Sequence, residues 1–369
     1  MQNKSFLTKI ELVGFKSFGK DQSVDLKPIN IIIGANGAGK SNFISFFKML
    51  NYMVTGCFQS YVATSGFSEN LLFNGSKKTP IIKAHLFFRN DRFRNEYIFT
   101  LVKSIEDRLI FAEETMLSGK QSFELSGGQK ESYFYTKYLE HANEKALKTI
   151  LSKCKAFQFH DTSESSHIRN SASLKDNNNL SSDGGNIAYF LYNLKTSSEI
   201  NKKYYNRIVE YVRLVVPMFE DFVLEPSVFN LNQIQLRWKG KNNPDYVFNA
   251  NQLSDGSIRF IALASLLLQP PNFLPNVILI DEPELGLHPQ AIDLLGTMIN
   301  IASQHAQIVV ATQSPRLLDS FNTDQIIVAD SDTDNCTILR RLNENELSHW
   351  LEDYSLSQLW EKNVLGGQP

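Results

Sequence analysis

Three glycines, a lysine and a serine stand close together near the N-terminus, as Gly34, Gly37, Gly39, Lys40 and Ser41. Glycines allow a loop to curl so tightly that its backbone N–H groups converge on one anion, and a lysine adds positive charge. The spacing Gly-x4-Gly-Lys-Ser predicts a phosphate-binding loop, in which the lysine neutralises the β- and γ-phosphates of a nucleotide and the serine binds Mg²⁺. A chance glycine turn is the alternative interpretation.

Two carboxylates, Asp281 and Glu282, follow directly after the apolar run Val277–Ile280. Such a run predicts a buried strand that delivers both side chains to the edge of a sheet. Asp281 suits a Mg²⁺ ligand, and Glu282, which points differently, suits a general base that polarises an attacking water. The alternative interpretation is an ordinary acidic turn after a strand, which is disfavoured because the same chain also carries the phosphate-loop motif.

The segments around these residues alternate between strand and helix patterns. Ile29–Ile33 is apolar on both faces, as in a buried strand, and the glycine loop and a helix-like segment at Asn42–Leu50 follow it. The last third adds helices at Ile258–Leu268 and Ala291–Ala302 and a strand at Ile308–Ala311. This alternation predicts an α/β fold with a parallel sheet, and a nucleotide site at the carboxyl ends of its strands.

Outside this core the patterns are more varied. Phe6–Phe15 alternates like a half-buried antiparallel strand, and Ile81–Arg89 and Tyr97–Val102 are β-like. Residues 115–206 are polar and irregular apart from a helix at Tyr138–Cys154, and no heptad repeat is sustained. We therefore expect no long coiled coil. The predicted parts are an N-terminal half of the core at 1–110, a compact insertion at 111–206 and a C-terminal half at 207–369.

The composition of the chain indicates its cellular compartment and the kinds of partner that its charge could attract. The chain has 369 residues, 42% of them apolar, and its net charge of −2 gives no general attraction to DNA or membranes. Basic residues such as Lys202, Lys203 and Arg207 recur on one helix-like stretch, which favours a solvated helix face over a nucleic-acid patch. The three scattered cysteines, the absence of a signal peptide and the interrupted apolar runs predict a cytoplasmic protein without a membrane segment.

Several motifs resemble those of one superfamily. Gly14–Phe18 and Asn36–Asn42 are similar to the ATPase heads of the SMC and RecF kind, which belong to the ABC-type ATPases. Leu253–Arg259 resembles the signature of that superfamily, Asp281–Pro289 its Walker B motif and D-loop, and Ala311–Pro315 its switch segment. The resemblance implies an ABC/SMC-type head with a mixed sheet flanked by helices.

A narrower resemblance covers nearly the whole chain. Phe159–Ser163, the Leu-Ser-Asp-Gly segment and the ending Leu359–Gly367 resemble a bacterial group of predicted AAA-type ATPases of RecF/OLD character. The cofactors implied are ATP and Mg²⁺. The resemblance implies catalytic roles for Glu282, Lys40 and Gln313, metal binding by Ser41 and Asp281, and nucleotide binding by Gly34, Asn36, Gly37, Gly39, Lys40, Ser41, Asn42, Ser254 and Gly256.

Two segments compete for the signature. Leu125–Gln129 spells it literally, as Leu-Ser-Gly-Gly-Gln, whereas the segment at Ser254 departs from that spelling. The role requires a helix whose N-terminus presents N–H groups to a γ-phosphate across a dimer, shortly before the Walker B strand. Ser254 meets both conditions. Ser126 lies far upstream and precedes an aromatic run, so we expect a loop there.

Two further positions stay open. Gln313 stands where ABC ATPases usually carry a histidine, and it can donate a hydrogen bond but cannot take up charge, which leaves the turnover rate in question. The alternative for Gln313 is a cap of the next helix. Gln158, His160 and Asp161 are all candidates for the Q-loop residue that senses Mg²⁺ and water.

The function expected from this resemblance is a nucleotide switch. Two copies would sandwich two ATP molecules, with Ser254 and Gly256 of one chain completing the pocket of the other. The switch would act in DNA transactions or anti-phage defence and regulate a separate effector, which would be a nuclease or a toxin. DNA is a further candidate partner, and the dimer could be part of a higher assembly. The alternative is an ATP-gated scaffold in which hydrolysis is incidental.

Overall fold

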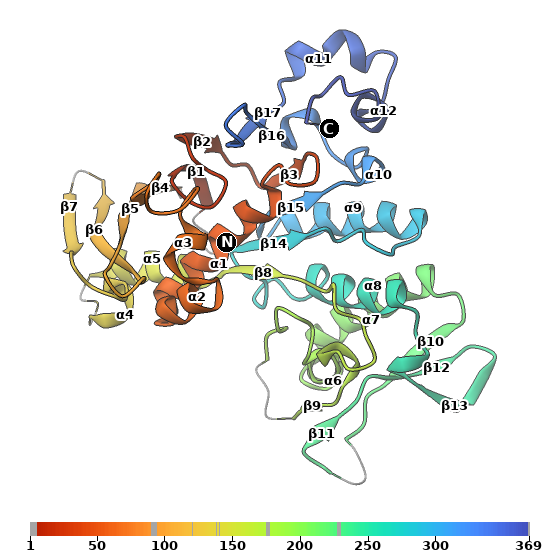
Figure 1. Cartoon of the computed structure of the whole chain (residues 1–369). Helices are drawn as coiled ribbons and strands as arrows, with labels where there is room; N and C mark the ends of the chain where they lie inside the picture. The colour runs from red at the N-terminus through yellow and green to blue at the C-terminus, as the bar shows by residue number, and fades with distance from the viewer. Residues whose placement is uncertain are drawn as a thin grey trace.

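The computed structural model describes residues 6–89, 94–119, 121–137, 139, 141–174, 178–226 and 230–367. At its centre is a six-stranded sheet in which β3 lies between β16 and β15 (Figure 1). All neighbouring strands in it are parallel except the antiparallel pair of β16 and β17. In spatial order the strands are β17 (Thr337–Arg341), β16 (Ile326–Ser331), β3 (Ile29–Ile33), β15 (Gln307–Thr312), β14 (Val277–Asp281) and β8 (Cys154–Phe157).

This sheet is buried on both faces, as the apolar runs predict. Ile31 and Ile33 pack into a core shared with the helices α8 and α9, whereas Ile32 packs into a second core around α1. Helix α1 follows the glycine loop directly, so the order strand, loop, helix is confirmed. These helices are α1 (Lys40–Thr55), α8 (Asp255–Leu267) and α9 (Pro289–Ser303).

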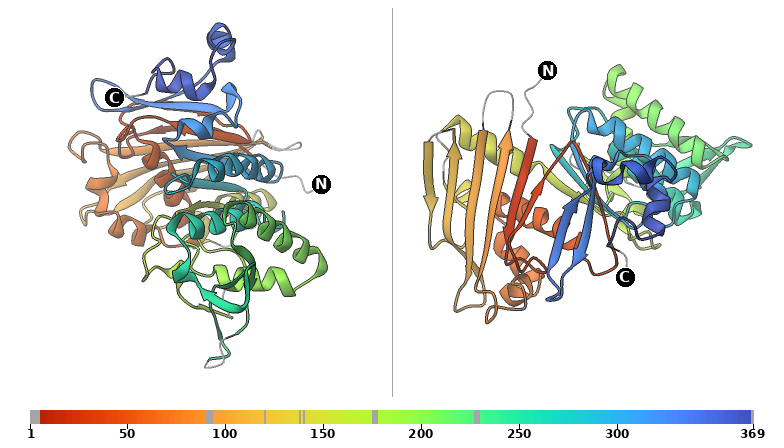
Figure 2. Two further views of the ribbon diagram at one scale, coloured as in Figure 1. Left: turned by 90° about the vertical axis from the view of Figure 1, so that its right-hand side faces the viewer. Right: turned by 90° about the horizontal axis from the view of Figure 1, so that it is seen from above.

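A second, antiparallel sheet closes the other side of α1 (Figure 2). The buried Gln307 ties the two sheets together, because its side chain accepts from Leu7 N (3.2 Å) and donates to Leu7 O (2.8 Å). In order the strands are β2 (Gln22–Asp25), β1 (Phe6–Val13), β4 (Ile81–Arg89), β5 (Arg94–Lys103), β6 (Leu109–Ser118) and β7 (Gln121–Ser126), flanked by α2 (Phe58–Thr64), α3 (Phe67–Leu71), α4 (Tyr133–Thr136) and α5 (Ala142–Ser152).

Two smaller groups of elements pack on the outer side of the parallel sheet. One lies beside α8 and the other beside α9, at opposite ends of the molecule in Figure 1. The first holds β9 (Ala172–Ser173), α6 (Ile187–Thr196), α7 (Glu199–Val215), β10 (Phe219–Val223), β11 (Gln233–Ile234), β12 (Arg237–Gly240) and β13 (Asn243–Asn249). The second holds α10 (Pro315–Leu318), α11 (Glu344–Leu351) and α12 (Leu356–Glu361). Short 3-10 turns are η1 (His167–Arg169), η2 (Ala250–Gln252) and η3 (Thr323–Gln325).

The expectation of an irregular segment over residues 115–206 is wrong in part. Strand β6 extends to Ser118, β7 continues the antiparallel sheet and β8 joins the parallel sheet. Helix α6 and the first half of α7 also lie within this segment. The predicted boundaries at 110 and 206 fall inside β6 and α7. The division into three parts stays a prediction. The longest helix in the described ranges is α7 with 17 residues, which agrees with the expected lack of a long coiled coil.

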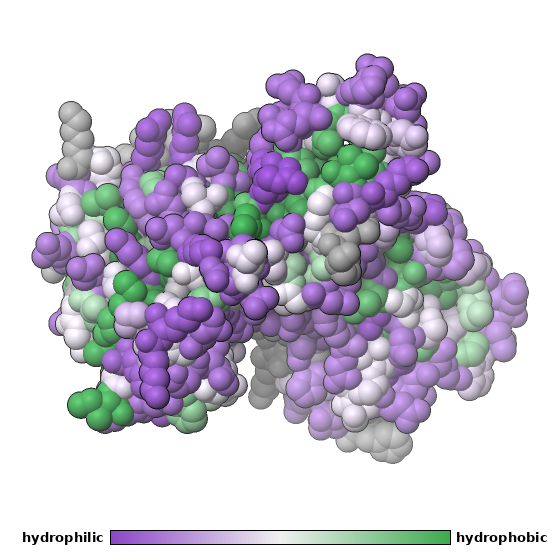
Figure 3. All heavy atoms as spheres, turned by 45° about the horizontal axis from the view of Figure 1, so that its top comes forward, coloured by the Kyte–Doolittle hydropathy of each residue, from purple (hydrophilic) through white to green (hydrophobic). Residues whose placement is uncertain are grey.

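Polar residues dominate the face shown in Figure 3, with small apolar groups among them. None of the helices within the described residues combines the length and the hydropathy needed to cross a membrane.

Candidate nucleotide-binding site

The glycine loop connects the end of β3 to the first turn of α1. Gly39 is the N-cap of α1 with φ 98°, and a Cβ atom there would lie 2.0 Å from Thr337 Oγ1. Gly37 also has a positive φ, of 84°, but faces open space. A Cβ atom on Gly34 would lie 2.3 Å from Ala329 O. Gly34 is therefore required by close packing on a backbone carbonyl, Gly37 by its conformation, and Gly39 by both its conformation and its contact with the Thr337 side chain.

Lys40 folds back over this loop. Its Nζ donates hydrogen bonds to Gly34 O (2.6 Å) and Ala35 O (2.9 Å), and the residue is only 5% exposed. Burial lowers the pKa of Lys40, while the negative charges of Glu282 and Asp281 act in the opposite direction. The ammonium group is thus held at the mouth of the loop, where a phosphate can replace the two carbonyl contacts.

Ser41 and Asp281 meet although they lie far apart in the sequence. Ser41 Oγ donates to Asp281 Oδ1 at 3.2 Å, because β14 runs parallel to β15 and β3 and ends at the same edge of the sheet. Burial raises the pKa of Asp281. A hydroxyl and a carboxylate are the oxygen donors that Mg²⁺ takes beside nucleotide phosphates, so this pair fits the expected metal.

Glu282 follows Asp281 in a strained backbone conformation with φ 43°. Its N–H donates to Ala311 O (2.7 Å), which holds the turn against β15, and its carboxylate Oε1 accepts a hydrogen bond from Gln313 Nε2. A positive φ at a residue other than glycine costs on the order of 1–3 kcal/mol and is common at functional sites. The structure therefore brings together Glu282 and Gln313.

Glu284 is a member of the site that the sequence analysis did not single out. Its Oε1 accepts from Thr312 Oγ1 (2.7 Å) and from Gln313 N (2.8 Å), whereas its buried Oε2 has no partner within the described residues. Burial raises the pKa of Glu284. Glu284 fixes the backbone of Gln313 and so aims the Gln313 amide at Glu282. The only feature of the sequence that could have indicated this role of Glu284 is the second glutamate in Asp-Glu-Pro-Glu.

Of the three Q-loop candidates, His160 is the one that contacts the Walker B strand. Its Nε2 forms a hydrogen bond with Asp281 O at 2.8 Å. Gln158 instead accepts from Lys48 Nζ (2.7 Å), and Asp161 bonds to Ser163 in an exposed turn. Which of the three acts as the Q-loop residue stays a prediction, but His160 has the most direct position.

Buried Arg259 in the first turns of α8 joins three segments. It donates to Phe159 O (2.9 Å), to His160 O (3.1 Å) and to Leu285 O. Burial lowers the pKa of its guanidinium. The arginine thus ties α8 to the His160 segment and to the turn at Leu285, which sequence spacing did not suggest.

Ser254 is the N-cap of α8, and its exposed Oγ accepts a hydrogen bond from Ser257 N (3.2 Å). Gly256 packs on the D-loop, where a Cβ atom would lie 2.3 Å from Gly286 O. No hydrogen bond joins either residue to residues 34–42 of the same chain in the part that the structure describes. The rival serine, Ser126, ends strand β7, and Gly128 N donates to Phe111 O, so no helix begins there.

The two asparagines of the loop differ in their positions. Asn36 is exposed at the tip of the loop, which suits its predicted contact with a nucleotide. Asn42 turns away, since its Nδ2 donates to Ser17 Oγ (2.9 Å), which also accepts from Thr337 Oγ1 (2.7 Å). Asn42 therefore braces the loop against the strand β17 in this structure.

The end of the chain also supports the loop. Gly367 O accepts a hydrogen bond from Ala35 N (2.6 Å), and a Cβ atom on Gly367 would lie 2.7 Å from Val328 Cγ1 and 3.0 Å from Ala329 O. Gly366 and Gly367 stand out in the sequence only as part of the resembling C-terminal segment, because nothing local links them to residue 35.

We expect Gly367→Ala to weaken MgATP binding by about tenfold, since the added methyl group must displace the carbonyl that holds Ala35 N. The measurement is titration calorimetry with a non-hydrolysable ATP analogue. Gly119→Ala is the matched control, because Gly119 has a similar φ of 61° but nothing within 4 Å of the added Cβ. Equal affinities of the two variants would show that the tail does not position the loop.

Comparisons with known proteins agree with this geometry. Residues 29–319 match the family model described as "AAA domain, putative AbiEii toxin, Type IV TA system". Among curated proteins there is no match.

Several solved structures share the fold. One is an SmcHead bound to the C-winged helix domain of ScpA, with a TM-score of 0.59, 16% identity and coverage of 93% of this chain and 99% of that one. Another is an Smc head bound to the C-terminal domain of ScpA from Pyrococcus furiosus, with a TM-score of 0.58, 14% identity and coverage of 95% and 99%. A third is the SMC head domain from Thermotoga maritima, with a TM-score of 0.50, 14% identity and coverage of 91% and 99%.

At these identities the likeness shows the fold alone, whereas the family model spans most of the chain. The chain thus has the fold of an SMC ATPase head, with a phosphate loop and two strand-end carboxylates at one sheet edge, and it belongs to the AbiEii-type AAA-domain family.

Proposed function

We propose that this protein hydrolyses ATP with Mg²⁺ at a site that a second copy of the chain completes. The observation that carries the proposal is the convergence of Lys40, Ser41, Asp281 and Glu282 at one edge of the parallel sheet. The exposed N-terminus of α8 at Ser254 supports the dimer, because its own chain leaves it without a phosphate-loop contact in the described residues.

Each residue has a role that its position supports. Lys40 neutralises the terminal phosphates, and Glu282 accepts the proton of the attacking water while Gln313 orients its carboxylate. Ser41 and Asp281 would hold Mg²⁺, which when bound neutralises charge on the phosphates. The helix dipole and N–H groups at Ser254 and Gly256 of the second copy would face the γ-phosphate.

The dimer is tested by Ser254→Asp. Aspartate is as good an N-cap as serine, so α8 should keep its start, but its negative charge would repel a γ-phosphate. We expect unchanged binding of ATP to the monomer and at least a tenfold weaker MgATP-dependent dimer, since removing about 1.4 kcal/mol suffices for that factor. Light scattering of the Glu282→Gln protein, with and without the second substitution, measures the dimer.

Ser126→Asp is the matched control, and it should leave both ATP binding and dimer formation unchanged. If Ser126→Asp blocks the dimer and Ser254→Asp does not, the signature lies at the literal Leu-Ser-Gly-Gly-Gln segment. If the protein stays monomeric with MgATP in every form, the proposed composite site is wrong.

The wider role follows from the switch. Hydrolysis would remove the γ-phosphate that bridges the two copies and so release the dimer, and a separate effector, a nuclease or toxin, would respond to that change. We place this switch in DNA transactions or anti-phage defence. The second candidate is an ATP-gated scaffold, which is favoured by Gln313, since its uncharged amide cannot take up a proton as a histidine can.

A further inference from the structure

Strand β8 is the edge strand of the parallel sheet next to β14, and part of its backbone faces away from β14. Val277 N donates to Lys153 O, and Val277 lies opposite Cys154 in the register. Because bonds in a ladder use alternate residues, Lys155 turns its backbone toward β14 while Ala156 turns its own outward. Edge strands offer such groups for pairing with another chain.

The outward side of β8 is only partly occupied. Gln158 N donates to Ser182 O, so the segment that contains Ser182 begins to pair with the strand there. In the described ranges no hydrogen bond reaches the backbone of Ala156 from that side. A cavity of about 470 Å³ opens at this point, and its walls include Ala156, Gln158, Ser182, Lys48 and Asn51.

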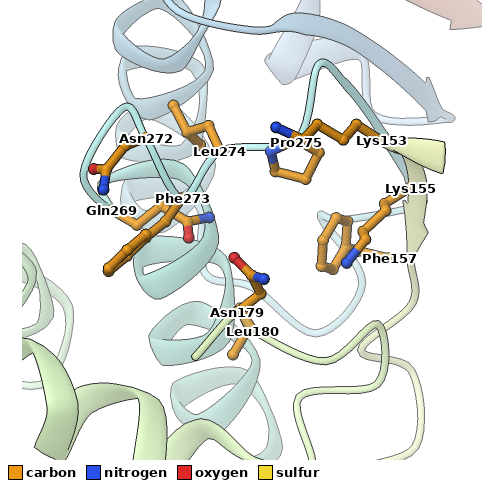
Figure 4. Close-up of a pocket in the computed structure, with 10 residues that line it drawn as sticks. All are labelled: Lys153, Lys155, Phe157, Asn179, Leu180, Gln269, Asn272, Phe273, Leu274 and Pro275. Carbon is orange, nitrogen blue, oxygen red and sulfur yellow. The ribbon is translucent and has the colours of Figure 1, made fainter. Parts of the chain in front are cut away.

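A second cavity, of about 180 Å³, lies on the other face of β8 (Figure 4). Lys155 and Phe157 lie beside each other on one wall, and Phe273 lies across from them. Gln269, only 3% exposed, lines the same cavity, and its Oε1 has no hydrogen-bond partner in the described part of the chain. Lys155 and Leu180 border both cavities, so the two meet at the edge of the strand.

These two cavities have the arrangement that an added strand requires. A strand that pairs with the outer edge of β8 would send alternate side chains to opposite faces of the sheet, and thus one set toward each cavity. The larger cavity is polar on its α1 side, where Lys48 and Asn51 lie, and the lining of the smaller one includes buried Phe157 and the partly exposed Phe273.

The charge around this edge is positive. The Lys48 ammonium group donates to the neutral Gln158 Oε1, and the Lys155 ammonium group has no hydrogen bond or ion pair with any described residue. Burial lowers the pKa of both lysines, because each ammonium group is partly dehydrated. The Asp281 carboxylate acts in the opposite direction on Lys48, whereas the neighbouring charge of Lys153 lowers the pKa of Lys155 further. Asp183 is the one acid that lines either cavity, and it is already paired with His167 Nδ1 at 2.8 Å.

We propose that the outer edge of β8 is a docking site for an extended acidic segment of a partner protein, which pairs with Ala156 and places its side chains in the two cavities. A peptide backbone can match the outward N–H and C=O groups of Ala156, and a nucleic-acid strand cannot form such a ladder. Docking there is a binding property separate from ATP hydrolysis, although Gln158 leads directly to His160 and so to Asp281.

The test begins with a displayed library of random eight-residue peptides selected on the full-length protein. We expect the selected peptides to be rich in Asp and Glu alternating with β-branched or aromatic residues. Synthetic copies should bind at least about tenfold more weakly to Ala156→Pro and to Lys155→Glu than to the unaltered protein. Fluorescence anisotropy of labelled peptides measures the affinity.

Each variant removes one feature of the site. Proline at 156 deletes only an outward N–H, which an edge strand tolerates, and thermal unfolding checks that the fold is kept. Lys155→Glu reverses the charge without touching the ladder. Lys203→Glu, on the exposed face of α7, is the control for net charge and should bind the peptides normally. Lys40→Ala should also bind them normally, whatever becomes of the proposed ATPase.

Three results would overturn the docking site. The first is a selection that yields no peptide, or only neutral or basic peptides. The second is equal binding of the selected peptides to the unaltered protein, Ala156→Pro and Lys155→Glu. The third is displacement of the peptides by single-stranded DNA with loss of DNA binding in Lys155→Glu, which would make this edge a nucleic-acid site.

Discussion

Glu282→Gln should bind MgATP as well as the unaltered protein, accumulate as a dimer and lose at least about a hundredfold in turnover. The amide keeps the shape of the side chain and can still accept the hydrogen bond from Gln313 Nε2. It cannot take a proton from water, and it removes a negative charge near Lys40. Phosphate release at saturating ATP measures turnover, and light scattering measures the dimer.

Glu346→Gln on the exposed part of α11 serves as a matched control, because it makes the same change in charge away from the site. If Glu282→Gln keeps its turnover, Glu282 is not the base and the neighbouring Glu284 becomes the next residue to replace. If turnover is lost while the biological activity of the protein persists, the scaffold interpretation is preferred over the hydrolytic switch.

Lys40→Ala should abolish nucleotide binding, and the MgATP-dependent dimer with it. In the unaltered protein, a ligand at a hundred times its Kd stabilises the fold by about 2.7 kcal/mol, and this gain should disappear in the variant. The reason is that Lys40 Nζ is held over the loop by two carbonyl oxygens and is the loop's own cation. The rise in Tm on adding MgATP measures the effect.

The comparison must use the MgATP-dependent shift and not the Tm itself. Removing the buried Lys40 leaves Gly34 O and Ala35 O without their donor, so the variant without nucleotide should also unfold at a lower temperature. Lys203→Ala, on the solvent face of α7, should show the full shift. A shift that persists in Lys40→Ala would contradict the assignment of the phosphate loop.

The two largest effects depend on one geometric relation. Glu282 follows the end of β14, and Lys40 follows the glycine loop that leaves the end of β3; the two strands are separated in the sheet only by β15. Gln313 follows the intervening strand β15 and donates a side-chain hydrogen bond to Glu282. Both predictions therefore concern the same edge of the sheet. Glu282→Gln tests the hydrolysis of the nucleotide there, and Lys40→Ala tests its binding.

Strong local patterns explain where prediction from the sequence succeeded. Ile29–Ile33 and Ile81–Arg89 are strands with the predicted bounds, because consecutive apolar or alternating residues carry their signal. Prediction failed for β8, whose residues Cys154–Phe157 have no strong strand pattern. They form a strand because they pair with Val277–Ile280, far along the chain. The residues next to them in the sequence do not indicate that pairing.

By itself the sequence determined which groups could do chemistry, namely a glycine loop with Lys40 and Ser41 and an apolar strand that ends in Asp281 and Glu282. Side-chain type, spacing and strand polarity are local properties, so they can be recognised before any fold is known. Only the tertiary structure decided how these groups are held. Contacts such as Glu284 with Gln313, Arg259 with the D-loop and Gly367 with Ala35 join residues whose proximity depends on sheet register and packing.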